Sequence, residues 1–335
     1  MKILQISPTY SGIGGIAQHV RGLEKYLINT GNNVNIISSD NSFTLPIKGL
    51  KNPSFMLSSS LKTRFMKKHD IVHAHNVPSA KAMKNAKGKK ILTLHGIFSE
   101  QIDMLHGKTT GKISQKYEID ALESADAITV VSKDAKEHYS KLGFDVHLIP
   151  NAIDIDALPK SENRMFEKQI IYVGRLSKEK GILELLSVSK ELPGDVNLII
   201  VGNGPEENNV KTASKQENIH YLGYLPPEKT IPLIRGSDFL IQPSLIEGIS
   251  SSILEAMACK TVIIATDVGG NSEILTDQQT GFLIKEHNEI IPSIEKLYDD
   301  FDFKKRLIKN AFEHVKKYDW TIIGKKYLKL YSSLL

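Results

Sequence analysis

The chain has 335 residues, 41% hydrophobic and 24% charged, a composition typical of a globular protein with room for two domains. A single cysteine, Cys259, excludes a disulfide framework within the chain and a cysteine-based metal site. The net charge of +5 is uneven: residues 1–155 carry 20 Lys and Arg against 13 Asp and Glu, whereas the remainder carries 23 against 25.

No apolar run approaches the length of a membrane span, and the chain opens directly on a predicted strand. We therefore expect no signal peptide and a cytoplasmic location. Cys259 follows Ala258 at an apolar helix end, which favours a packed thiol.

Short runs rich in Ile and Val alternate with helical patterns throughout. Strands are predicted at Lys2–Ser7, Asn33–Ser38, Ile71–Ala74, Lys90–His95, Ala127–Val131 and Val146–Ile149, and again at Gln169–Val173, Asn197–Val201, Ile219–Leu222, Phe239–Gln242, Thr261–Thr266 and Phe282–Ile284. Helices are predicted between most of them, for example at Gly15–Thr30, Gln115–Ser124, Gly181–Glu191, Pro227–Gly236 and Ser250–Ala258. This alternation predicts an α/β fold with two doubly wound, Rossmann-like domains of parallel strands.

The segment Pro150–Glu167 is rich in proline and polar residues and marks the boundary. We expect domains at residues 1–155 and 156–317, followed by a final helix at 318–335. Open parallel sheets bind ligands beyond the carboxyl ends of their strands, so the two domains are expected to face each other across one cleft.

Glycines at the first strand-to-helix turn let backbone amides approach a phosphate. The pattern Gly12-x-Gly14-x-x-Ala17 also matches a dinucleotide fingerprint, and Asp40 ends the second strand at the distance expected for a ribose contact. However, five residues, Pro8 to Gly12, separate this turn from the strand. The match to the fingerprint is therefore incomplete. A nicotinamide-dependent oxidoreductase using NAD(P) is kept as an alternative function.

Two basic clusters account for much of the charge in the first half, at residues 62–68 and 81–90. Interleaved Phe65, Met66 and Met83 suggest contact with an anionic membrane or a phosphate-bearing acceptor. In the second cluster this interpretation rests on Lys84, Lys87, Lys89 and Lys90. The alternative is a solvated helix face. Nucleic acid is not expected, because no recognised nucleic-acid module is visible.

In the second half, Arg175 and Lys180 bracket a turn between a strand and a helix. Two fixed cations at that position could clamp a diphosphate and stabilise a departing nucleotide, although ordinary turn charges would look the same. Lys180 is expected to be a solvent-lined cation whose replacement hardly changes stability. The turns Gly202-Asn203-Gly204 and Gly223-Tyr224 follow strand ends and suit backbone contacts to a nucleobase and ribose.

Glu247 and Glu255 lie eight positions apart, the first in a loop and the second in the opening turns of a helix that starts near Ser250. Carboxylates there can accept sugar hydroxyl protons, while free N–H groups at the helix start attract an anion. Without further support, the two residues could equally be unrelated surface positions.

Further motifs occur in a recognisable order: Asp70-Ile71-Val72-His73, Thr93-Leu94-His95-Gly96, Ile149-Pro150-Asn151, Val173-Gly174-Arg175-Leu176, Val201-Gly202-Asn203-Gly204-Pro205, Leu222-Gly223-Tyr224, Pro243-Ser244, Glu247 to Met257, and Thr280-Gly281-Phe282. Together they resemble the retaining glycosyltransferases of the GT-B fold, in the large family 4 type that carries an E-x7-E motif. The resemblance spans nearly the whole chain. It also implies that the helix after Tyr318-Asp319-Trp320 crosses back to the first domain.

The resemblance implies a nucleotide-diphosphate sugar, UDP- or GDP-linked, as donor, and a hydroxyl acceptor on a glycan or lipid-linked saccharide. It implies that Arg175 and Lys180 hold the diphosphate, Glu255 the ribose and Glu247 the donor sugar. Backbone amides at Ser250 and Ser251 would support the sugar and phosphate, Gly14 and Gly15 would close over the diphosphate, and His95 would contact the sugar near the reacting carbon. The turns at Gly174, Gly202, Asn203, Gly204, Gly223 and Tyr224 would complete donor binding.

Family members often have Gly-Phe-Gly after the first Glu, where this chain has Gly248-Ile249-Ser250, so the donor sugar is not indicated. Asp154-Ile155-Asp156 looks like a metal-binding D-x-D but lies in the predicted linker. No cofactor and no divalent metal are expected, because Arg175 and Lys180 can stabilise the leaving group. A catalytically dead sugar-nucleotide-binding protein is a third hypothesis, which the intact charged residues disfavour.

Overall fold

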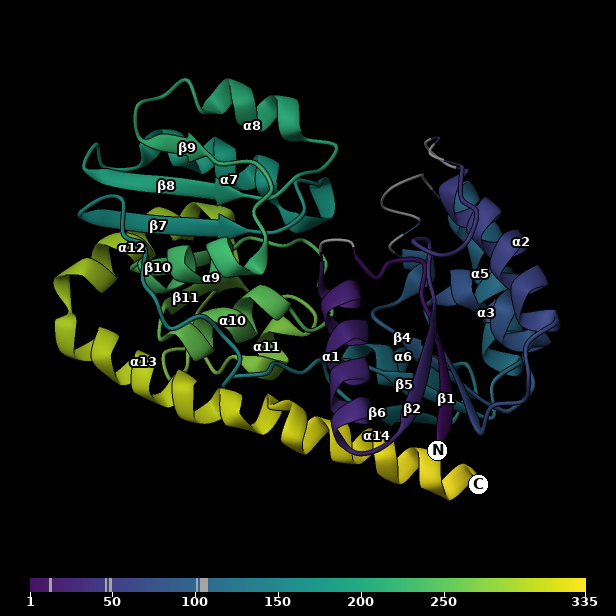
Figure 1. Ribbon diagram of the computed structural model, residues 1–335. Coiled ribbons are helices and arrows are strands. Elements are labelled where there is room, and N and C mark those ends of the chain that lie inside the picture. Colours follow the sequence, from purple (N-terminus) through teal and green to yellow (C-terminus); the bar gives the residue numbers. More distant parts are fainter. Residues whose placement is uncertain (12–13, 46, 48–49, 101, 103–107) are drawn as a thin grey trace. The chain divides into compact units, whose positions relative to one another are not determined.

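The structure is a computed structural model that describes the chain except for residues 12–13, 46, 48–49, 101 and 103–107. By internal contacts the chain divides into two compact units (Figure 1). Unit 1 comprises Met1–Ala152 and Trp320–Leu335, and unit 2 comprises Ile153–Asp319. Each described unit contains one six-stranded sheet.

Unit 1 alternates strands and helices in the order expected for a parallel sheet. The strands are β1 (Lys2–Ile6), β2 (Asn33–Ile37), β3 (Ile71–His75), β4 (Lys89–Leu94), β5 (Ala127–Val130) and β6 (Val146–Leu148). The helices are α1 (Gly15–Asn29), α2 (Lys51–Arg64), α3 (Val77–Asn85), α5 (Lys108–Glu123), α6 (Lys133–Lys141) and α14 (Trp320–Leu334). All strand pairs in the order β2-β1-β3-β4-β5-β6 are parallel.

Unit 2 repeats this plan with the order β12-β11-β10-β7-β8-β9, again entirely parallel. The strands are β7 (Lys168–Val173), β8 (Val196–Val201), β9 (Ile219–Tyr221), β10 (Phe239–Gln242), β11 (Val262–Thr266) and β12 (Phe282–Ile284). The helices are α7 (Ile182–Val188), α8 (Glu207–Ala213), α9 (Pro227–Arg235), α10 (Ser251–Cys259), α11 (Asn271–Ile274), α12 (Ile290–Asp299) and α13 (Phe301–Val315). Short 3₁₀ turns lie at Lys178–Lys180, Ser189–Glu191, His287–Glu289 and Lys316–Tyr318.

All twelve predicted strands are present, with ends within one residue of the prediction. The helix predicted at Gln115–Ser124 is longer and begins at Lys108, and the helix predicted at Gly181–Glu191 ends at Val188 before a 3₁₀ turn. Cys259 is a buried free thiol, as expected.

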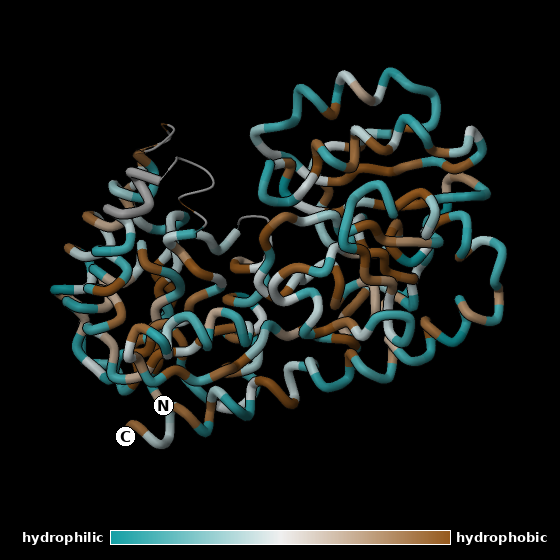
Figure 2. The backbone as a smooth tube through the Cα atoms, turned by 180° about the vertical axis from the view of Figure 1, so that it is seen from behind, coloured by the Kyte–Doolittle hydropathy of each residue, from teal (hydrophilic) through white to brown (hydrophobic). Residues whose placement is uncertain are grey.

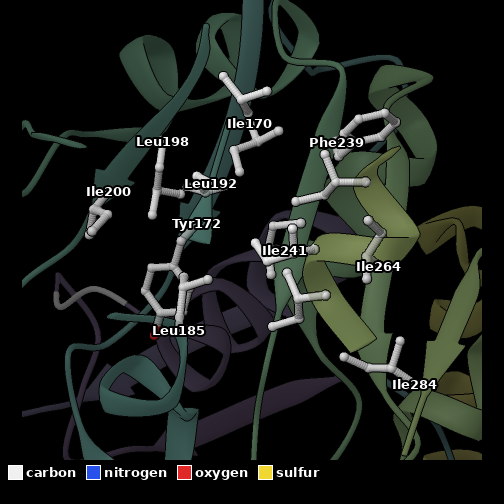
Figure 3. Packing of buried hydrophobic residues seen from close by; sticks show 14 of the residues in the cluster. Ile170, Tyr172, Leu185, Leu192, Leu198, Ile200, Phe239, Ile241, Ile264 and Ile284 are labelled. Carbon is white, nitrogen blue, oxygen red and sulfur yellow. The ribbon is translucent and has the colours of Figure 1, made fainter. Parts of the chain in front are cut away.

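Successive side chains along each strand point to opposite faces of the sheet, so each sheet contributes hydrophobic residues to the core on both faces. In unit 1, Leu4 and Ile6 join a cluster under α3, α5 and α6, whereas Ile3 joins a cluster under α1 and α14. In unit 2 the buried side chains of the central strands, Tyr172 and Ile241 among them, pack together beside the crossover helices (Figure 3). The hydropathy colouring of the backbone shows the hydrophobic stretches concentrated along the strands inside each unit (Figure 2).

The last helix, α14, belongs to unit 1, as the resemblance implies for the crossing helix. It packs on α1 at very short range, because a Cβ atom added to Gly22 would lie 2.3 Å from the indole Nε1 of Trp320. Trp320 and Tyr327 are part of the core beneath α1.

Candidate active site

The carboxyl edge of the sheet in unit 2 carries most of the residues predicted to bind a donor. From β7 the chain winds outward to β8 and β9, and from β10 it winds the other way to β11 and β12. β7 and β10 are therefore neighbours at the topological switch point, where open parallel sheets bind their ligands. Arg175 and Lys180 follow β7, and Glu247 follows β10.

Lys180 and Glu247 form an ion pair across this switch point. Lys180 Nζ lies 2.6 Å from Glu247 Oε1, and the two side chains are 26% and 7% exposed. The sequence predicts Lys180 as a solvent-lined cation with no structural part. The structure adds a partner that this prediction does not include, because the ammonium neutralises a carboxylate that has almost no contact with water.

The second oxygen of Glu247 is held by uncharged donors. Ser244 Oγ donates to Glu247 Oε2 at 3.0 Å, and Gln242 Nε2 donates to the same oxygen at 3.2 Å. Gln242 Oε1 in turn accepts from Ser252 Oγ at 2.8 Å, and Ser250 Oγ lies 3.0 Å from Ser252 Oγ. The carboxylate is thus fixed in direction before any ligand arrives.

Sequence reasoning does not single out Gln242 or Ser252. One feature of the sequence could have indicated Gln242: it is a polar residue at the last position of a buried strand, at the edge of the sheet where ligands bind.

Two close backbone approaches hold the loops of this network together. Gly181 adopts φ +67°, and a Cβ atom there would lie 1.7 Å from the carbonyl oxygen of Pro243. Glu247 O accepts from Gly270 N at 3.1 Å, and a Cβ atom on Gly269 would lie 2.0 Å from that oxygen. Larger residues at Gly181 or Gly269 would push apart the loops that present Lys180 and Glu247.

Arg175 has a looser ion pair, with its Nη1 3.7 Å from Glu179 Oε1. Ser177 Oγ also donates to Glu179 Oε1, at 2.6 Å. The backbone of Arg175 is held through its carbonyl, which accepts from Tyr172 OH at 2.8 Å. The guanidinium is largely exposed, so it remains accessible to an anionic ligand. Glu179 is a third member of the site, after Gln242 and Ser252, that sequence reasoning misses.

The predicted glycine turns lie at the same edge. Gly174 N donates to Val201 O at 3.1 Å, and Gly202 N donates to Gly223 O at 2.8 Å, so the turns after β7, β8 and β9 are joined side by side. A Cβ atom on Gly202, at φ +146°, would lie 1.9 Å from Gly174 O.

Asn203 and Gly204 are held by close backbone contacts with Leu176. Asn203 O accepts from Leu176 N at 2.9 Å, and a Cβ atom on Gly204 would lie 2.3 Å from Leu176 O. Tyr224 is exposed beside this edge.

Helix α10 begins beside Glu247. Ser250 is its N-cap residue with extended backbone but without a side-chain capping bond, and Ser251 is its first residue. Glu255 lies one turn further along and is buried. The positive end of this helix therefore adds to the attraction of Lys180 and Arg175 for an anion.

In unit 1, Gly14 is the N-cap of α1 at φ +118°, with nothing near the position of a Cβ atom, and Gly15 is the first helical residue. Gly12 lies outside the described residues. Asp40 is engaged locally: it accepts from Ser11 N at 3.0 Å and from Ser11 Oγ at 2.8 Å. A dinucleotide ribose would have to displace both bonds.

Histidines gather at the carboxyl edge of the sheet in unit 1. His73 Nδ1 lies 2.7 Å from Tyr331 OH, and its Nε2 lies 2.6 Å from Thr93 Oγ1, so both ring nitrogens of this buried residue have partners. His75 Nδ1 lies 3.4 Å from His95 Nε2. His73 therefore has a structural part, whereas His95 follows the end of β4 and is only partly buried.

Burial lowers the pKa of each histidine in this cluster. The pKa of His73 falls to about 3 and that of His95 to about 4, and the pKa of His19 on α1 and of His75 falls well below the usual range. Mutual repulsion among the rings adds to the effect for His19, His73 and His75. His95 is therefore an uncharged imidazole at neutral pH.

Comparison with known proteins agrees with this geometry. The family model "Glycosyl transferases group 1" matches residues 154–314, and "Glycosyltransferase Family 4" matches residues 13–157. The chain belongs to the family 4 type of glycosyltransferases. It therefore transfers sugars, and its fold is GT-B.

Individual similarities are distant but extensive. Phosphatidyl-myo-inositol mannosyltransferase of Mycobacterium leprae is 24% identical over 79% of this chain and 74% of its own length. Sucrose-phosphate synthase from Thermosynechococcus elongatus has a TM-score of 0.84 at 19% identity, covering 99% of this chain and 98% of that one. Anabaena Alr3699/HepE in complex with UDP-glucose has a TM-score of 0.77 at 20% identity, covering 99% and 100%. At these identities the two structures establish the fold.

Within the described residues, one group of side chains has the spacing of metal ligands: His19, His75 and His95, with ligand atoms within 4.8 Å of one another. Asp154 belongs instead to a turn, where its Oδ1 accepts from Ala157 N at 3.2 Å. This bond gives Asp154 a structural part, and the interpretation of Asp156 stays a prediction.

The predicted acceptor lysines are spread over two elements and the segment between them, which contains Lys87. Lys84 lies on α3 and pairs with Asp120 at 2.5 Å, whereas Lys89 and Lys90 open β4 at the amino edge of the sheet. Met83 is completely buried, so the prediction that it contacts a membrane is wrong. None of the described helices is both long and apolar enough to cross a bilayer.

Proposed function

We propose that this glycosyltransferase moves a sugar from a UDP- or GDP-linked donor to a hydroxyl acceptor with retention of anomeric configuration and without a metal ion. The observation that carries the proposal is the Lys180–Glu247 pair at the switch point of unit 2, 2.6 Å long and beside the start of α10. The pair places a cation that can bind a diphosphate next to a carboxylate that can accept hydrogen bonds from sugar hydroxyls.

In this proposal Lys180 and Arg175 hold the donor diphosphate, and α10 directs its N-terminal amides to the same group. As the bond between the anomeric carbon and the diphosphate oxygen breaks, negative charge grows on the leaving nucleotide. The two cations stabilise that charge, which is the part a divalent metal has in other transferases. No protein nucleophile is required.

The acceptor oxygen forms the new bond to the anomeric carbon on the face that the diphosphate leaves. Its proton passes to the departing phosphate oxygen, so atoms and charge balance within donor and acceptor. The protein contributes position and electrostatics. Glu247 orients the donor sugar, Glu255 the ribose, and the turns at Gly202 and Gly223 the nucleobase.

The resemblance also implies donor contacts from Gly14, Gly15 and His95, which belong to unit 1, and these contacts stay a prediction. The pKa of His95 is lowered to about 4, so its ring is neutral at pH 7 and hydrogen-bonds the sugar without adding positive charge.

Two similar proteins support the choice of substrates. HepE was solved with UDP-glucose, which supports a nucleotide-sugar donor, and the M. leprae relative is a phosphatidyl-myo-inositol mannosyltransferase, which supports a lipid-linked acceptor as one option beside a soluble glycan. We place the reaction in the cytoplasm, where nucleotide sugars are available.

The test is nucleotide release from a panel of UDP- and GDP-sugars by the wild type, Lys180→Met, Glu247→Gln and the matched control Lys178→Met. We expect turnover of at least one donor, retained by the control and lost in the other two variants. The anomeric configuration of the product, read by NMR, tests retention, and an inverted linkage would refute it. Tight nucleotide binding without turnover would instead identify a dead sugar-nucleotide-binding protein.

A further inference from the structure

Helix α2 in unit 1 exposes a hydrophobic stripe. Leu57, Leu61 and Phe65 recur every fourth residue along α2 and its C-cap, so they lie on one face, and they are 62%, 61% and 80% exposed. Scattered single apolar residues are normal at a surface, but a contiguous row of this kind marks an interaction site.

The buried face of α2 is unusually polar. Ser59, Ser60 and Thr63 are buried there, with Phe55 as the large apolar contact. Their hydroxyl groups are satisfied locally: Thr63 Oγ1 donates to Ser60 O at 3.0 Å, and Asn85 Nδ2 of α3 donates to Ser60 Oγ at 2.6 Å. A helix that buries serines and exposes leucines reverses the usual arrangement, so the stripe is not explained by folding of unit 1.

The segment before α2 extends this apolar surface. Ser58 Oγ donates to Phe43 O at 2.7 Å, and Lys62 Nζ donates to Asn41 O at 2.8 Å, so residues 41–43 lie against the helix. Phe43 is itself strongly exposed. The backbone of Phe43 thus lies against the helical turn that carries Leu57.

All the charged residues in this part of the chain are basic. Residues 41–69 contain six cationic side chains, Lys48, Lys51, Lys62, Arg64, Lys67 and Lys68, and no Asp or Glu. Arg64, Lys67 and Lys68 are exposed around Phe65. His69 N donates to Lys87 O at 3.0 Å, which brings a further exposed lysine to the same end of the surface.

We propose that this surface, formed by Phe43, Leu57, Leu61, Phe65, Arg64, Lys67 and Lys68, docks on a membrane that contains anionic phospholipid. Apolar side chains enter the interface while the flanking cations contact lipid phosphates, the combination that holds interfacial helices on membranes. A second copy of the chain fits poorly, because two such surfaces carry the same charge. Nucleic acid would leave the row of leucines exposed.

The experiment measures binding of the intact protein to vesicles of phosphatidylcholine with 30% phosphatidylglycerol, in about 0.1 M salt, without donor or acceptor. The variant is Leu57→Gln, Leu61→Gln and Phe65→Gln together. Its matched control is Ile28→Gln, Leu142→Gln and Ile322→Gln, three exposed apolar residues of unit 1 outside the surface. We expect at least a tenfold loss of vesicle affinity for the first set and none for the control, roughly the effect of keeping three partly buried side chains out of the interface.

A charge variant tests the second half of the proposal. Arg64→Ser, Lys67→Ser and Lys68→Ser together should weaken binding about a hundredfold, at roughly fivefold per charge, whereas Lys116→Ser, Lys136→Ser and Lys329→Ser should not. Binding should also fall steeply with salt and be weak on pure phosphatidylcholine.

Four outcomes would overturn the proposal. Wild-type protein could ignore anionic vesicles at low salt, or bind them equally after the Leu57, Leu61 and Phe65 changes. Binding could be lost only on changing Lys84, Lys87, Lys89 and Lys90, which would locate the contact on the other predicted cluster. Concentration-dependent dimerisation without lipid, abolished by the three Gln changes, would identify a second copy as the occupant. Because no sugar nucleotide is present, failure here leaves the proposed transfer reaction untouched.

Discussion

Replacing Lys180 by Met should destabilise unit 2, although Lys180 belongs to a proposed ligand site. The change removes the cation 2.6 Å from Glu247 Oε1 and leaves a carboxylate that is only 7% exposed. A charge-assisted hydrogen bond is worth about 1.5–3 kcal/mol, and an uncompensated buried charge costs about 3–5 kcal/mol. Glu247 keeps the donors Ser244 and Gln242 on its other oxygen, so we expect about 2–3 kcal/mol.

For a unit of this size, each kcal/mol shifts Tm by roughly 2–4 °C, so the loss should be about 4–12 °C in thermal unfolding. A double-mutant cycle with Glu247→Gln isolates the pair, because the amide carries no charge to leave unpaired. The double variant should recover part of the loss, with a coupling of about 1.5 kcal/mol or more. Lys178→Met is the matched control on the same 3₁₀ turn, and its Tm should stay within about 2 °C of the wild type.

Additive effects in the cycle, or an equal loss of Tm in Lys178→Met, would contradict this expectation. Either result would mean that the Lys180–Glu247 contact contributes nothing to the folded state, and the pair could not be a preorganised part of the site. Sequence reasoning alone expects no change in stability, so the measurement also separates the two interpretations of Lys180.

Four further outcomes are expected. In calorimetry, Lys180→Ala should weaken nucleotide-diphosphate binding by about 1.5–3 kcal/mol, and unchanged affinity would remove Lys180 from the site. Glu247→Gln should abolish transfer but leave the affinity for the free nucleotide diphosphate no weaker, because it releases Lys180 from its partner. Transferase activity should be unchanged in EDTA. Complete loss of activity in EDTA, restored by Mg²⁺ or Mn²⁺, would contradict the metal-free mechanism. Burial lowers the pKa of His73 to about 3, against 6.5 in an unfolded chain, so the unfolded state takes up the extra proton as pH falls. The contribution of neutral His73 to the free energy of unfolding should be full above pH 6.5 and should be lost as the pH falls toward 3. His73→Gln should reduce the dependence of that free energy on pH by at most about 1.4 kcal/mol per pH unit.

Local sequence patterns predict the strands, the helices and the edge of the sheet at which the candidate site lies. Strands show as short runs of Ile and Val because parallel strands are buried on both faces, and glycine turns with charged residues mark the strand ends. Arg175, Lys180, Glu247 and the start of α10 could therefore be assigned to one ligand-binding edge from local pattern and family resemblance. Those signals depend on neighbours in the chain, which a sequence displays directly.

Which of these residues contact one another depends on the tertiary structure. Lys180 and Glu247 are 67 positions apart and touch because β7 and β10 are adjacent in the sheet, a result of global topology that no local pattern encodes. The same holds for Gln242 and Ser252, whose polarity acquires meaning only when they reach the second oxygen of Glu247. Met83 and α2 show the converse case: which side of a helix faces the core depends on what packs beneath it. There the structure buries Met83 and three hydroxyl side chains while Leu57, Leu61 and Phe65 face outward.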